Sequence, residues 1–218
     1  MNRQSVFILS ALAAVVAAGC AMAPAAPTAQ QVDEATRQVL QSSFREQGIA
    51  RLDRIRQDDT SNQACSAAQG EPLDERQAKG IEAVNLATVK PPSDGRYLGD
   101  WREGEKIAQN GRGLTWTDKP GELAGGSCYN CHQISKAELS FGSIGPSLYQ
   151  YGKIRGVADP ASADSRAIVE YTWGKLWNAK AYNACSGMPR FGHAGILNEA
   201  QLRDVMALLL DPKSPVNQ

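Results

Sequence analysis

Two cysteines and a histidine lie close together in the segment Cys128-Tyr129-Asn130-Cys131-His132. The short spacing lets one turn of chain carry both thiols, and the histidine follows the second thiol directly. Thiols held in this way can add across the two vinyl groups of a haem while the imidazole faces the iron. The segment therefore predicts a covalent attachment site for one haem c, whose chemistry is electron transfer.

Two other interpretations of the paired cysteines are less consistent with the sequence. Half of a zinc site would need further paired Cys or His residues at short spacing, and the sequence has none. A thioredoxin-like motif would need a βαβ context, whereas helical patterns dominate this chain. Haem attachment remains the preferred interpretation.

A haem iron that is held by one histidine needs a second axial group or an open position. Met1 and Met22 lie near the N-terminus, and Met206 lies in an apolar helical pattern that reads as core. Met188 instead lies in a loop rich in Gly and Pro, where a long apolar side chain has no other evident role. Met188 is the predicted distal ligand, which would raise the reduction potential relative to two histidines, and His193 is the alternative.

The first residues of the chain have the pattern of an export signal. Within residues 1–19, Arg3 supplies a short positive region, and Ser5 to Ala18 form an apolar stretch that is too short to span a membrane. Ala17-Ala18-Gly19-Cys20 resembles a lipoprotein box, which predicts lipidation of Cys20, and ordinary cleavage near Ala23-Pro24-Ala25 is the alternative. We expect a periplasmic protein, tethered through residues 20–29 if Cys20 is lipidated.

Two of the five cysteines remain after the haem pair and Cys20 are set aside. These two, Cys65 and Cys185, would be unfavourable as free thiols in the oxidising compartment that an export signal implies. We predict a disulfide between them. It would tie the N-terminal segment to the loop that carries Met188.

The charge balance restricts the class of partner. Lys plus Arg and Asp plus Glu each number 23 among 218 residues, and no long run of like charge occurs. A nucleic-acid surface or a polybasic membrane-binding segment is therefore not indicated, and membrane contact is expected only through the candidate lipid anchor. The expected partners are other proteins.

Helical patterns dominate the chain, and no convincing alternating strand occurs. We expect a helix over residues 30–48 that stops at Gly48, and a last helix that opens on a capping box at Asn198-Glu199-Ala200-Gln201 and runs through Leu210. Other helices are expected over residues 73–89, 100–108 and 165–177. Trp173 and Trp177 share one face of the 165–177 helix and are interpreted as aromatic core rather than as an electron path.

A helix before the haem motif and a final helix that cross each other are typical of class I cytochromes c. The chain resembles that fold from about Asp100 to Pro212, which predicts an all-α protein with a helical N-terminal extension at 30–98 and a cytochrome c domain at 99–213. In that fold a Gly-Pro pair after the motif orients the axial imidazole through its Nδ1 hydrogen, and Gly145-Pro146 matches it in kind.

A closer resemblance is carried by several short segments, which are Gly99-Asp100-Trp101, Gly125-Gly126-Ser127 with the motif that follows it, Gly145-Pro146-Ser147-Leu148, Met188-Pro189-Arg190-Phe191-Gly192 and Leu209-Leu210-Asp211-Pro212. In these segments the chain is similar to the SoxX family, the monohaem subunit of the SoxAX sulfur-oxidation cytochrome. The resemblance implies that Cys128 and Cys131 form the thioethers, that His132 is the proximal ligand and that Met188 is the distal ligand.

The same resemblance implies partners and a reaction. A SoxA-type haem subunit would form a heterodimer with this chain and carry catalysis, coupling thiosulfate to a cysteine of the carrier SoxYZ. This chain would be the electron-transfer subunit of that L-cysteine S-thiosulfotransferase, with no catalytic residue of its own, and would pass electrons to a small cytochrome c. The alternatives are a free-standing periplasmic shuttle to a membrane oxidase and a haem-based sensor or peroxidase with an open axial position.

Overall fold

The structure, a computed structural model, describes residues 26–56 and 59–218, without the side chains of residues 55 and 56. The predicted signal peptide and Cys20 lie outside these residues. Every regular element in the described part is a helix, and the predicted all-α class is confirmed. The chain divides into two compact units, Met1–Arg45 and Glu46–Gln218.

The first unit contains helix α2 (Ala29–Ser43), which a capping box between Thr28 and Gln31 opens. None of the fifteen described residues of α2 is buried. The helix ends before the predicted stop at Gly48, because Phe44 already takes an extended conformation. Gly48, at φ +57°, instead lies in a turn bridged by Gln47 and Ala50.

The second unit begins with short helices that the sequence analysis assigned to the N-terminal extension. These are α3 (Asp53–Arg56), α4 (Thr60–Ala67) and α5 (Glu75–Leu86). The buried amide of Asn85 donates to Ser61 Oγ at 3.0 Å and accepts from Asn178 Nδ2 at 3.0 Å. This network joins α4 and α5 to Asn178, so residues of the predicted N-terminal extension contact residues of the predicted cytochrome c domain.

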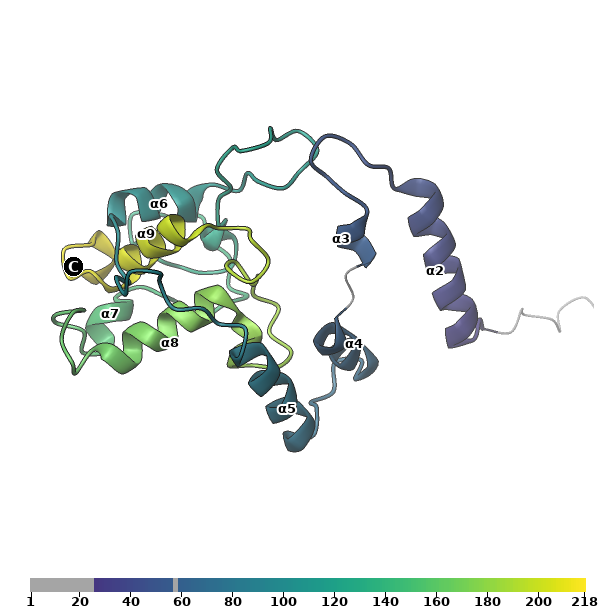
Figure 1. Cartoon of the computed structure of the whole chain (residues 1–218), viewed down its shortest axis with the longest axis horizontal. Helices are drawn as coiled ribbons and strands as arrows, with labels where there is room; N and C mark the ends of the chain where they lie inside the picture. Colours follow the sequence, from purple (N-terminus) through teal and green to yellow (C-terminus); the bar gives the residue numbers. More distant parts are fainter. Residues whose placement is uncertain (1–25, 57–58) are drawn as a thin grey trace, which may run out of the picture. The chain divides into compact units, whose positions relative to one another are not determined.

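Helices α6 (Trp101–Gln109) and α9 (Glu199–Leu210) pack against each other (Figure 1). The predicted capping box of α9 is present, with Asn198 accepting from Gln201 N–H at 2.9 Å. Gly104 allows the close approach, because a Cβ atom there would lie 2.1 Å from the backbone oxygen of Asp204. Met206 is fully buried in the core, as its helical pattern indicates.

The remaining helices pack around α9. Helix α8 (Arg166–Trp177) contacts α9, as do the short α7 (Tyr151–Ile154) and the 3₁₀ turn η3 (Pro215–Asn217). Trp173 is buried in the core and donates its indole N–H to Lys90 O at 2.7 Å. Trp177 stacks on it at a centroid distance of 6.1 Å, in agreement with the predicted aromatic core.

Substituting Gly104→Ala is expected to lower the free energy of unfolding by about 1 to 3 kcal/mol, because the new methyl group forces α6 away from α9. Chemical denaturation measures this change. Gly80→Ala in α5 is the matched control, since no atom lies within 4 Å of its added Cβ and alanine favours a helix interior by about 0.5 to 1 kcal/mol. Equal stability of the two variants would contradict the close helix crossing.

Candidate functional site

The two motif thiols lie on a single tight turn. The 3₁₀ turn η1 (Cys128–Asn130) is closed by hydrogen bonds from Cys131 N–H and His132 N–H to Cys128 O, at 3.1 and 2.9 Å. Gly126 N–H donates to Ile107 O at 2.8 Å, which fixes the start of the turn to the end of α6. The structure therefore brings both thiols and the imidazole together on a segment held by α6.

The orientation of His132 follows from one hydrogen bond. Its Nδ1 atom lies 2.7 Å from Pro146 O, and a carbonyl oxygen only accepts, so Nδ1 carries the proton and Nε2 keeps a free lone pair. Gly145 makes room for the ring, because a Cβ atom there would lie 2.1 Å from His132 Cε1. The Gly-Pro contact that the sequence predicts is present.

Tyr129, between the two cysteines, is a contributor that the sequence analysis missed. Its ring is buried, and its hydroxyl donates to Glu105 Oε1 of α6 at 2.9 Å. Burial, together with this hydrogen bond and the carboxylate charge, raises the pKa of Tyr129, which stays protonated. The residue holds the motif turn against α6, and no local signal marks it because its partner lies 24 positions away.

The pKa of the Cys128 thiol is shifted in the opposite direction to that of a reactive redox thiol. Burial raises its pKa to about 12, so the free thiol is protonated at neutral pH. Thioredoxin-like cysteines instead have lowered pKa values, because the thiolate is the nucleophile. The environment of Cys128 therefore favours an apolar attachment point over thiol–disulfide exchange.

Met188 lies half-buried against the hydrophobic core on which Cys128 also packs. The alternative ligand His193 is exposed, and its backbone N–H donates to Trp177 O at 3.0 Å. Of the two candidate distal ligands, Met188 is thus the one whose side chain faces apolar surroundings.

A disulfide joins Cys65 of α4 to Cys185, with Cα atoms 5.5 Å apart and a sequence separation of 120. Cys128 and Cys131 are free thiols. The structure thus contains the predicted disulfide between Cys65 and Cys185, and it leaves the two motif thiols free.

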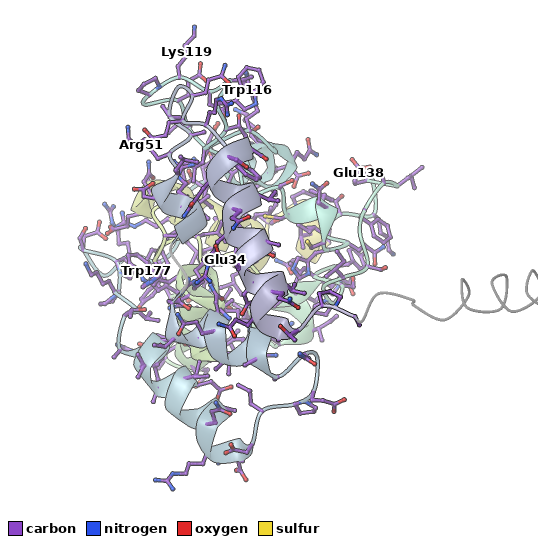
Figure 2. The ribbon with its side chains drawn as sticks, turned by 90° about the vertical axis from the view of Figure 1, so that its right-hand side faces the viewer. Glu34, Arg51, Trp116, Lys119, Glu138 and Trp177 are labelled. Atoms are coloured by element: carbon purple, nitrogen blue, oxygen red, sulfur yellow. A yellow bond between two sulfur atoms is a disulfide. The ribbon has the colours of Figure 1, made fainter. Side chains whose placement is uncertain are left out.

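The side chain of Trp177, which is labelled in Figure 2, carries a hydrogen-bond donor that is unpaired among the described residues. Its indole Nε1 is buried and finds no hydrogen-bond acceptor among the described residues. The ring packs against Gly192, where a Cβ atom would lie 2.6 Å from the ring carbons. Gly192 ends the loop of residues 183–192 that carries Met188, called the Met188 loop below, and an additional polar group could satisfy the unpaired indole donor beside it.

The loop that leads from α6 to the motif is held by Asp118, which the sequence analysis did not single out. Its carboxylate accepts from Gly113 N–H, Thr115 N–H and Thr115 Oγ1 at 2.8 to 2.9 Å. The side chain is only 5% exposed, whereas Trp116 and Lys119 extend outward at the edge of the loop (Figure 2). One carboxylate therefore organises a loop that lacks a regular helix over the described residues 111–127.

Acid is expected to loosen this loop. The N–H and hydroxyl of Thr115, against an opposing effect of burial, hold the pKa of Asp118 below its ordinary value of 3.8. A lowered pKa stabilises the fold above pH 3.8, and this contribution is lost as the pH falls through the folded-state value. Amide exchange at Gly113 and Thr115 should accelerate in that acid range. Asp118→Ala, which removes the acceptor, should show faster exchange than the wild type at every pH above that range, and identical profiles would contradict this role.

No protein-family model matches the sequence. Over 133 residues the chain is 37% identical to a protein of Aquifex aeolicus (strain VF5) described as an uncharacterized lipoprotein. The match covers 61% of this chain and 59% of that protein, so the chain spans less than two thirds of the relative. In the described part of the chain, no helix has the length and hydropathy needed to cross a membrane.

Proposed function

We propose that this chain is an exported monohaem c-type cytochrome that transfers electrons in the periplasm. The observation that carries the proposal is the 2.7 Å contact between His132 Nδ1 and Pro146 O, on the segment that also presents both thiols. This contact leaves Nε2 available for a metal, which is the orienting arrangement that metal-ligating histidines use. A thiol-exchange site would not require this contact.

The available side chains fit a haem. Cys128 and Cys131 would hold it through thioether bonds, His132 Nε2 would be the proximal ligand and Met188 Sδ the distal ligand. The buried, unpartnered Nε1 of Trp177 suits a carboxylate acceptor of the kind that a haem carries. When bound, haem c supplies a one-electron iron couple.

The class I cytochrome c fold is part of the proposal. In support of it, a helix that precedes the motif packs against the last long helix at Gly104, and the motif turn is attached to the end of that first helix. Tyr129 and Gly126 fix the turn to α6, while the Met188 loop leads into α9. The segment that carries His132 is thus attached to the end of α6, and the segment that carries Met188 leads to the start of α9.

The resemblance to SoxX supports a more specific role. We place this chain in a heterodimer with a SoxA-type haem subunit, which would couple thiosulfate to a SoxYZ cysteine, and in electron transfer to a small cytochrome c. The relative described as a lipoprotein supports lipidation of Cys20. The proposed location is therefore the periplasm, with the chain tethered to a membrane.

The test is purification of the protein from its native host, with detergent to release the form that is tethered to a membrane. The expected result is covalent haem with His/Met absorption in a stable complex with a second haem-bearing subunit. A haem-bearing monomer without that subunit would support the free-standing shuttle in place of the SoxX role. Exported protein without covalent haem would overturn the cytochrome proposal altogether.

A further inference from the structure

Both ends of the Met188 loop are attached to the N-terminal helices that precede α6. The described residues 183–192 form turns and extended chain, and the backbone N–H of Met188 reaches only Ser186 Oγ at 3.3 Å. The other hydrogen bonds within this segment lie before Met188, from Cys185 N–H and Ser186 N–H to Asn183 at 3.2 and 3.0 Å, and none of them fixes the Met188 side chain. The position of Met188 is therefore set by the contacts on either side of it.

The first attachment lies three residues before Met188. Cys185 is bonded to Cys65 of α4, and the preceding Ala184 N–H donates to Glu82 Oε1 of α5 at 3.3 Å. This end of the loop is thus joined to two helices of the N-terminal extension, by one covalent bond and one hydrogen bond.

The second attachment lies two residues after Met188. Arg190 Nη1 lies 2.5 Å from Asp59 Oδ2, and the two side chains are 19% and 37% exposed. Asp59 also caps α4, accepting from Asn62 N–H at 2.9 Å. The carboxylate is thus oriented by the helix that it caps, and it holds a largely buried guanidinium in place.

We propose that Asp59 and Arg190 are positioning residues for Met188, through which the N-terminal extension sets the strength of the distal ligand and hence the reduction potential. The inference rests on the proposed function. Axial thioether bonding is one of the factors that set a haem potential. Loss of Asp59 would leave Arg190 buried without its counter-charge, and the segment beside Met188 would move to hydrate it.

Asp59→Asn tests this role, because asparagine is as good a helix cap as aspartate but cannot pair with a guanidinium as an anion. We expect covalent haem content to be unchanged, most of the methionine–iron charge-transfer band at the red end of the oxidised spectrum to be lost, and the midpoint potential to fall. Arg190→Gln, which removes the positive charge of the pair, should cause the same loss of the charge-transfer band. Arg190→Lys, which keeps the positive charge, should retain much of the band.

Asp74→Asn is the matched control, since Asp74 caps α5 through an equal 2.9 Å contact with Gln77 N–H. This variant should retain the wild-type band and potential. If Asp59→Asn and Arg190→Gln also retain them, the positioning role is wrong while the cytochrome stands. If the wild-type holoprotein carries haem but lacks the band, ligation by Met188 is wrong, and this inference is overturned with it.

Discussion

Replacing Cys128 and Cys131 together by serine is expected to leave the exported chain without covalently attached haem. Serine preserves the size of the side chain and the backbone bonds that close η1, but its hydroxyl does not form the thioether that haem attachment requires. Haem staining of the denatured protein measures the loss directly, because only covalently attached haem survives denaturation. A single Cys128→Ser or Cys131→Ser variant should retain attachment through one bond.

The control for this experiment is the Cys65→Ser, Cys185→Ser variant, which removes the same number of thiols and leaves the motif intact. It should stain for haem at the wild-type level per molecule of exported protein. Covalent haem on the Cys128→Ser, Cys131→Ser variant would show that attachment uses other residues. That result would remove the basis of the proposed function.

The second large effect is expected from loss of the disulfide itself. Joining residues 120 positions apart restricts the unfolded chain, and loop-entropy arguments give a contribution of about 4 to 5 kcal/mol for a loop of this length. The Cys65→Ser, Cys185→Ser variant should therefore unfold at a much lower denaturant concentration than the wild-type holoprotein. Chemical denaturation followed by far-UV circular dichroism measures the difference.

A reductant separates the disulfide from any effect of the serine side chains. Treating the wild type with dithiothreitol should bring its unfolding midpoint close to that of the serine variant, and the variant itself should not respond. A wild-type midpoint that is insensitive to the reductant, together with an unchanged variant, would contradict the Cys65–Cys185 bond.

Local sequence signals predicted the features that depend on neighbouring residues. The spacing of Cys128, Cys131 and His132 fits a single turn, and the capping box before α9 occurs where Asn198 and Gln201 predict it. The helix expected over residues 165–177 differs from α8 by one residue. In each of these segments the residues that form the structure lie within a few positions of one another, so their pattern can be read without knowledge of the fold.

Features that depend on distant residues could not be predicted in this way. Gly104 reads as a weak helix residue until Asp204 is known to lie against it. Asp59 reads as an ordinary helix cap, although it also pairs with Arg190. The buried network around Asn85 could not be predicted for the same reason, because it joins Ser61, Asn85 and Asn178, which are far apart in the sequence.

The covalent bond between Cys65 and Cys185 bears on the order of events during biogenesis. If the chain is exported from its N-terminus as proposed, then among the four cysteines of the described residues Cys65 emerges first, Cys128 and Cys131 follow, and Cys185 emerges last. These four cysteines admit several pairings, and among them the partners nearest to Cys65 in the sequence are the two motif thiols. The disulfide between Cys65 and Cys185 closes a segment of chain that includes the motif. Early haem attachment would keep the motif thiols from forming a non-native disulfide with Cys65, and a disulfide isomerase would correct such a bond.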